Sequence, residues 1–195
     1  MRKAGWEKNF YLIEGFPKNQ EGLDAWRNVL KEKIDTKMVL SYDGTIKIME
    51  KRLLERGQVG SLTDDDFEGV KQRLAAYQEE VQPVVKQFEK EKLLKKINAD
   101  KNIQTIFSDS QNALKSVKKF LRIPDPKPNV IFVLGAEGSG KKAQCERIID
   151  EFKFVSLCVG DLLRGETNTD SPLCREIEGY IMQGQIVPVT INILN

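Results

Sequence analysis

Short apolar runs alternate with longer, more polar stretches along this chain. The apolar runs, most of them rich in β-branched or aromatic residues, predict five buried strands at residues 10–13, 38–42, 94–97, 130–134 and 154–158. The stretches between and after them predict helices at residues 21–33, 45–56, 65–92, 102–120 and 142–152. Strands that alternate with helices predict an α/β fold, in which helices cover both faces of a five-stranded parallel sheet.

Glycine and proline mark several boundaries. Gly57 is a C-terminal stop signal for the second predicted helix, and Pro83 predicts a kink or break in the third. Residues 1–4 look like the last turn of a helix stopped by Gly5, and Pro188 opens a helix-like run toward the end of the chain. The chain is therefore expected to begin and end inside the same kind of helix.

A proline-rich segment divides the chain. Residues 121–129 contain Pro124, Pro126 and Pro128, which favour a stiff, extended backbone. We interpret this segment as a linker between a first block, residues 1–120, and a second block, residues 130–195.

Composition excludes several classes of function. Lys and Arg number 31 against 29 Asp and Glu, so the net charge of +2 gives no overall attraction to nucleic acid. The chain has no histidine, which excludes Ser-His and Cys-His catalysis, and no metal ligands are expected. Cys145, Cys158 and Cys174 fit no metal or redox motif and are expected to be buried, reduced thiols of a cytoplasmic protein. No apolar run is long enough to span a membrane, and a signal peptide is not expected.

A glycine-rich loop carries the clearest chemical signal. The fourth predicted strand is followed by Gly135, Gly138, Ser139, Gly140 and Lys141, and then by a predicted helix. Glycines let backbone N–H groups converge on phosphate oxygens, and the helix N-terminus and the lysine add positive charge. The alternative is a strand-to-helix turn without a ligand. The lysine and the placement of the loop favour phosphate binding.

The loop departs from the general pattern at two positions. Lys142 stands where a Ser or Thr hydroxyl would reach magnesium, and Glu137 places a carboxylate inside the loop.

These motifs resemble those of the adenylate and UMP-CMP kinases. Residues 130–144 resemble the family's nucleotide loop, and residues 154–164 and 184–188 resemble its monophosphate-binding region. In the first block, residues 10–20 (FYLIEGFPKNQ) resemble the family's Phe-Leu-Ile-Asp-Gly-Phe-Pro-Arg-Asn-Gln. Residues 53–73 resemble the short lid and its flanks, and residues 95–99 the last strand. The resemblance implies a P-loop NTPase-type fold.

The order of the motifs is reversed. The family runs from the phosphate loop to the lid, whereas here the lid half comes first. Two arrangements fit: a fragment of a tandem array of kinase-like domains, or a circularly permuted single domain. The sequence favours the fragment, because permutation inside a helix is rare in nature.

The resemblance implies phosphoryl transfer from ATP, with Mg2+, to a nucleoside monophosphate such as AMP, UMP or CMP. Lys141 would then contact the donor phosphates, and Arg164 and Lys18 the acceptor phosphate. Arg73 would approach the transferring group. Arg56 would stack on the donor base, with the loop residues Gly135 to Lys141 around its phosphates, and Gln20 would contact the acceptor base. Asp64 and Asp65 would shape the lid or cap the next helix. Each of these side chains alone could instead be a solvated surface group.

Several positions depart from the family pattern. The altered residues are Glu14, Lys18, Leu62, Lys142, Ala143 and Val159. A phosphoryl-gripping arginine is worth roughly 10³ to 10⁵ in rate, so the loss of one at Leu62 predicts slow or absent turnover. We therefore favour a degenerate module that binds nucleotide or serves as an interaction domain. Its partners would be other domains of the same chain or proteins of a larger assembly, and family analogy suggests the ciliary axoneme. The alternative is an active kinase in which Arg52, or an arginine from elsewhere, replaces the missing group.

Overall fold

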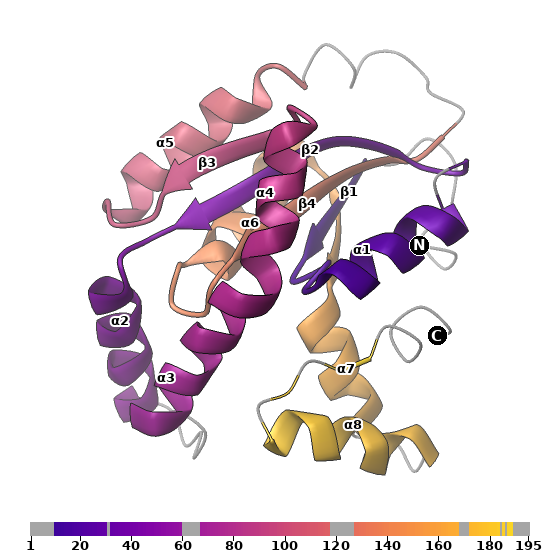
Figure 1. The fold of residues 1–195 in the computed structure, drawn as a ribbon. Coiled ribbons are helices and arrows are strands. Elements are labelled where there is room, and N and C mark those ends of the chain that lie inside the picture. The colour runs from indigo at the N-terminus through magenta and orange to yellow at the C-terminus, as the bar shows by residue number, and fades with distance from the viewer. Residues whose placement is uncertain are drawn as a thin grey trace.

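The computed structural model describes residues 10–30, 32–59, 67–117, 127–167, 172–183, 185 and 187–188 (Figure 1). All of the predicted strands are present and form one parallel sheet of five strands in the order β3-β2-β4-β1-β5. Their bounds are β1 Phe10–Glu14, β2 Asp35–Asp43, β3 Leu94–Asn98, β4 Asn129–Gly135 and β5 Val155–Cys158. The predicted α/β fold with a five-stranded parallel sheet is confirmed.

Both blocks contribute strands to this one sheet. The central strand β4 belongs to the second block and lies between β1 and β2 of the first block. Leu12 of β1 is the Cα partner of Ile131 on one side and of Ser156 on the other. The two blocks therefore share one hydrogen-bonded sheet, as a permuted single domain requires. The fragment of a tandem array stays a prediction.

The helices are α1 Gln20–Leu30, α2 Ile46–Val59, α3 Phe67–Ala76, η2 Tyr77–Val81, α4 Gln82–Lys90, α5 Ile103–Leu114, α6 Lys141–Phe152, α7 Val159–Thr167 and α8 Pro172–Met182. The stop expected at Gly57 is wrong, because α2 continues through it to Val59. The first predicted helix ends early, at Leu30, whose carbonyl accepts the N–H groups of Lys33 and Ile34.

The long third helix is interrupted near Pro83, as predicted. The interruption is a wide π-helical turn, η2, and Pro83 follows it in the first turn of α4. Proline is tolerated there because the first turn of a helix needs no intrahelical donor. The predicted linker extends one residue too far, since the buried Asn129 already belongs to β4. The helical turns expected at residues 1–4 and beyond Pro188 lie outside the described residues, as do residues 118–126.

Two apolar layers hold the sheet between helices. Alternate residues of β4 point to opposite faces, so Val130 and Phe132 pack with α1 and α4, whereas Ile131 packs with α5 and α6. Figure 1 shows α1 and α4 on one side of the sheet and α5 and α6 on the other. Every residue of β4 is buried. This burial on both faces explains why the strand reads as a continuous apolar run.

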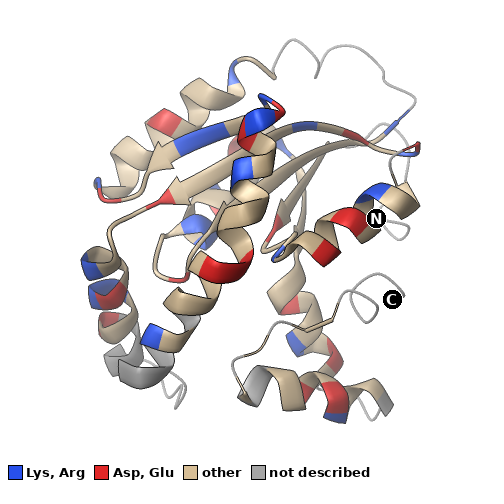
Figure 2. Ribbon diagram, viewed as in Figure 1, with Lys and Arg blue, Asp and Glu red and all other residues tan. Residues whose placement is uncertain are grey.

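The helices α7 and α8 lie beyond one end of the sheet (Figure 1) and share a small apolar cluster around Leu163 and Ile177. Both signs of charge occur on most of the described elements (Figure 2), which agrees with the balanced composition. Across the described residues, no helix combines the length and the apolar character that a membrane crossing requires.

Candidate functional site

The candidate site lies where β1, β4 and β5 end. Glu14, Gly135 and Cys158 are the last residues of these neighbouring strands. In open α/β sheets, ligands bind at the carboxyl ends of the strands, where loops and helix N-termini meet. Elements of both blocks therefore surround one edge of the sheet.

The phosphate loop has the predicted strand–loop–helix geometry. Gly138 and Gly140 have φ angles of 78° and 80°, a region that favours glycine. A Cβ atom on Gly138 would lie 2.5 Å from the backbone oxygen of Met49, so α2 packs directly on the loop. Gly140 precedes α6, whose N-terminus adds a partial positive charge to the loop. The loop is thus shaped as an anion cradle.

Lys141, the first residue of α6, folds back over the loop. Its Nζ donates a hydrogen bond to the carbonyl oxygen of Ala136 at 3.3 Å. The lysine thereby stands at the mouth of the cradle, where the sequence places a phosphate-binding cation.

A cationic cluster joins the two blocks at this site. Lys18 is half-buried, between β1 and α1, and its pKa is lowered, first by desolvation and then by the charge of Lys141. Arg164 lowers the pKa further, whereas Glu137 and Cys158 raise it. Lys18, Lys141 and Arg164 were predicted from three separate motifs, and the charges of Lys141 and Arg164 both act on Lys18. An anion bound among them would relieve their mutual repulsion.

Glu14 places a buried carboxyl group at the site. Its side chain is buried at the end of β1, and burial raises its pKa, while the charges of Lys141 and Lys142 act in the opposite direction. Cys158 and Asp161 both act on the pKa of Glu14, and Glu14 and Asp161 act on that of Cys158. The carboxylates of Glu14 and Asp161 are thereby joined into one cluster.

Asp161 engages two cations of the site. Its carboxylate accepts hydrogen bonds from Arg164 at 2.5 Å and from Lys142 at 3.2 Å. The bond from Arg164 is the main reason that the pKa of Asp161 falls to about 2. The arginine expected to hold an acceptor phosphate is therefore bound to a carboxylate of its own helix.

Arg52 contacts the phosphate loop, a position that the sequence did not predict. From α2, its guanidinium donates to the carbonyl oxygens of Gly138 at 3.4 Å and Lys101 at 3.3 Å. The sequence suggested it only as a substitute for a missing lid arginine. The structure places it on the phosphate loop.

The remaining predicted site residues either make contacts within their own helix or lie outside the described part of the structure. Gln20 is exposed at the start of α1 and donates to Asp24 of the same helix at 2.9 Å. Arg56 and Arg73 belong to α2 and α3, but their side chains lie outside the described part of the structure. Leu62, Asp64 and Asp65 also fall outside it.

The described residues do not fit a magnesium site of the usual kind. Ala143 has no hydroxyl, and the position after Lys141 holds the ammonium of Lys142, which is bound to Asp161. Two ammonium groups act on Glu14. Among the described residues, no three acidic, cysteine or histidine side chains gather as metal ligands.

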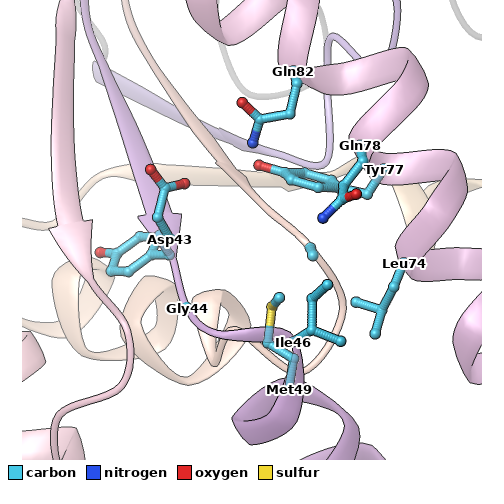
Figure 3. Close-up of a pocket in the computed structure, with 10 residues that line it drawn as sticks. Asp43, Gly44, Ile46, Met49, Leu74, Tyr77, Gln78 and Gln82 are labelled. Atoms are coloured by element: carbon cyan, nitrogen blue, oxygen red, sulfur yellow. The ribbon is translucent and has the colours of Figure 1, made fainter.

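A small cavity lies beside the phosphate loop. It measures about 80 Å³ and lies between the end of β2, the start of α2 and the turn η2, with Asp43, Met49, Leu74 and Tyr77 around it (Figure 3). Burial raises the pKa of Tyr77. Since one water takes about 30 Å³ of liquid volume, this space is too small for a nucleotide base.

The cysteines are free thiols in the structure. Cys145 is buried, as expected, and burial raises the pKa of its thiol. Cys158 and Cys174 are only partly buried, which corrects the expectation of full burial. Cys158 is the last residue of β5, and Cys174 donates to the carbonyl of Thr167 at 3.3 Å.

Comparison with known proteins agrees with the motifs. The UMP-CMP kinase of Rattus norvegicus is 36% identical over 106 residues, 54% of this chain and 54% of that protein. Over that stretch the chain is similar to UMP-CMP kinases. The UMP-CMP kinase of Danio rerio is 34% identical over 113 residues, 58% of each chain, and UMP-CMP kinase 2 of Caenorhabditis elegans is 29% identical over 119 residues, 61% of each.

The chain spans about half the length of the curated relatives it matches. No family model matches it. Together with the parallel sheet and the phosphate loop, the similarity supports a relationship to the nucleoside monophosphate kinases.

Proposed function

We propose that this chain is a nucleoside monophosphate kinase-like module that binds nucleotide phosphates at the ends of β1, β4 and β5 and transfers phosphoryl groups slowly or not at all. The observation that carries the proposal is the cationic cluster of Lys18, Lys141 and Arg164. It combines residues of both blocks, and a half-buried lysine with a lowered pKa is a group that gains from a bound anion.

Binding is supported by the form of the loop. Backbone N–H groups around Gly138 and Gly140 and the N-terminus of α6 favour phosphate oxygens. Lys141 would meet the donor phosphates, and Lys18 would meet the acceptor phosphate. Lysine binds phosphate as a point charge, without the two-pronged grip of arginine, so Lys18 aligns its ligand less strictly.

Poor turnover is supported by three features. Arg164 is bound to Asp161 and must leave it to grip a phosphate. Ala143 provides no hydroxyl, and Lys142 stands at the metal-facing position. Phosphoryl transfer depends on alignment and on cations around the moving group, and one such arginine is worth roughly 10³ to 10⁵ in rate. Binding can survive these changes when catalysis does not.

A second candidate is an active kinase that acts on UMP, CMP or AMP. The placement of Arg52 supports it, because its guanidinium already contacts the phosphate loop at Gly138. With a bound nucleotide, Arg52 could release this carbonyl and face the phosphates instead. The similarity to UMP-CMP kinases supports a pyrimidine acceptor.

The same proposal indicates what kind of partners this module would have. A module that keeps its fold and loses turnover serves as a binding or interaction domain, beside other domains or proteins. A place in the ciliary axoneme and membership of a tandem array stay predictions.

Two measurements on the same protein test the proposal. Calorimetry with ATP is expected to show binding, and a coupled assay with ATP and UMP, CMP or AMP is expected to show rates at least ~10³-fold below the usual 1–100 s⁻¹ of kinases. Turnover at ordinary kinase rates would replace the proposal with the second candidate. The absence of ATP binding would contradict both.

A further inference from the structure

The residue after the phosphate-loop lysine normally serves a metal ion. In phosphate loops of the general pattern, a Ser or Thr hydroxyl at this position reaches the magnesium that accompanies the nucleotide. Here that residue is Lys142, and the next one is Ala143. Neither residue carries a hydroxyl, and Lys142 adds a positive charge after the loop lysine.

The Lys142 ammonium lies among the carboxylates of the site. Its Nζ is 3.2 Å and 3.5 Å from the two carboxylate oxygens of Asp161. Its charge also acts on the buried Glu14, and so does the charge of Asp161. Acidic groups that could attract a divalent cation are thus already facing ammonium groups.

A magnesium ion would meet positive charge in this site. Lys141 and Lys142 both act on Glu14, and Lys18 lies close enough to Lys141 for its pKa to be lowered by it. A magnesium ion placed among them would add two more positive charges and therefore repulsion. The same cations attract a nucleotide that carries no metal.

We propose that this site binds nucleoside polyphosphates without a divalent cation, with the Lys142 ammonium supplying the charge that magnesium supplies elsewhere. The inference rests on the proposed nucleotide-binding function and specifies the form of its ligand. The side chain of Lys142 is 61% exposed, so it can turn from Asp161 to a phosphate oxygen. Metal-free ATP is therefore the preferred ligand, and its magnesium complex binds no more tightly.

Calorimetry of the full chain tests this inference. ATP is titrated once in EDTA and once in excess MgCl₂ at the same ionic strength, because phosphate binding depends on salt. The expected affinity in EDTA is equal to that in MgCl₂ within threefold, or higher. An affinity more than threefold higher in MgCl₂ overturns the inference and leaves the proposed function standing. Absence of binding in both buffers overturns the proposed function as well.

Variants separate the charge of Lys142 from the missing hydroxyl. Lys142→Ala is expected to weaken ATP binding in EDTA at least tenfold. Lys142→Ser is expected to bind ATP at least threefold more tightly with MgCl₂ than without it. Lys86→Ser, on the exposed surface of α4, is the matched control and is expected to behave as the unmodified chain. If Lys142→Ala binds ATP in EDTA as tightly as the control does, Lys142 does not take the place of the metal. The comparison of buffers needs only the unmodified chain, so it stands even if a variant fails to fold.

Discussion

Arg164 donates a hydrogen bond at 2.5 Å to Asp161, which lies three residues earlier. Both side chains are exposed, Asp161 in the first turn of α7 and Arg164 in its last turn, and the same carboxylate accepts from Lys142. A phosphate that binds here competes with Asp161 for both cations. Asp161 therefore acts as an internal competitor of the ligand.

Removal of that carboxylate charge is expected to strengthen phosphate binding. Asp161→Asn should raise the affinity for ATP or UMP about three- to tenfold, because Arg164 and Lys142 would no longer face a full negative charge. The effect is modest because each exposed ion pair that is lost is worth about 1 kcal/mol or less. Asp150→Asn, on the exposed side of α6, removes the same charge elsewhere and should have little effect. Equal affinities for both variants, measured by calorimetry, would show that Asp161 does not compete.

The lowered pKa of Lys18 predicts a pH dependence of binding. Because burial and Lys141 lower it below 10.5, Lys18 loses its proton before an ordinary lysine does as the pH rises. ATP affinity should therefore fall as the pH rises, before it reaches the ordinary lysine pKa of 10.5. Lys18→Arg should keep its affinity better over this range, since arginine stays protonated.

The stability of the chain should follow the same group. The unfolded chain holds the Lys18 proton more tightly, so this lysine destabilises the fold below its lowered pKa and the cost fades as the pH approaches 10.5. Urea unfolding of the unmodified chain and of Lys18→Met should therefore converge as the pH rises toward 10. A constant difference between the two proteins would contradict the lowered pKa.

Gly138 is predicted to be essential for the loop. Gly138→Ala would place a Cβ 2.5 Å from the Met49 carbonyl oxygen at a φ of 78°, and it should cost about 1–3 kcal/mol and abolish ATP binding. Gly165→Ala is the control, because nothing lies within 4 Å of a Cβ there and helical alanine should stabilise the chain by about 0.5–1 kcal/mol. Urea unfolding measures both. A Gly138→Ala protein as stable as the control would refute the close packing of α2 on the loop.

The shared sheet predicts energetic coupling between the blocks. Leu12 of β1 and Ile131 of β4 are register partners and belong to the same buried cluster. A double-mutant cycle of Leu12→Ala and Ile131→Val should give an interaction energy of about 0.5 kcal/mol or more. Additive effects on the free energy of unfolding would indicate that the two strands do not pack together.

The strands could be predicted from the sequence because each buried strand appears as a short run of apolar residues that are adjacent in the chain. β4 is buried on both faces and reads as an uninterrupted apolar run, and the loop after it has a recognisable spacing. The order of the strands could not be derived from the same pattern, since β1 and β4 pair across more than a hundred residues. The motifs could be recognised in the sequence, whereas the pairing of strands from the two blocks is seen only in the structure.

The features that the sequence did not predict correctly depend on contacts between elements that lie far apart in the chain. Gly57 failed as a helix stop because the packing of α2 overrides a weak local preference. The contact of Arg52 with Gly138 depends on how α2 meets the loop, and the ion pair of Lys142 with Asp161 joins separate helices. Residue types and spacing predicted the candidate cations, and their role in phosphate binding stays a prediction. They did not indicate which carboxylates would hold them.

The most direct test of the account is ATP binding, measured by calorimetry, to the unmodified chain and to one variant from each block. Lys18→Ala and Lys141→Ala should each weaken binding at least tenfold, whereas Lys86→Ala should leave it unchanged. That result would establish one phosphate site built from both blocks. If the unmodified chain does not bind ATP, or if the Lys18 variant binds as tightly as the Lys86 variant, the central claim is wrong.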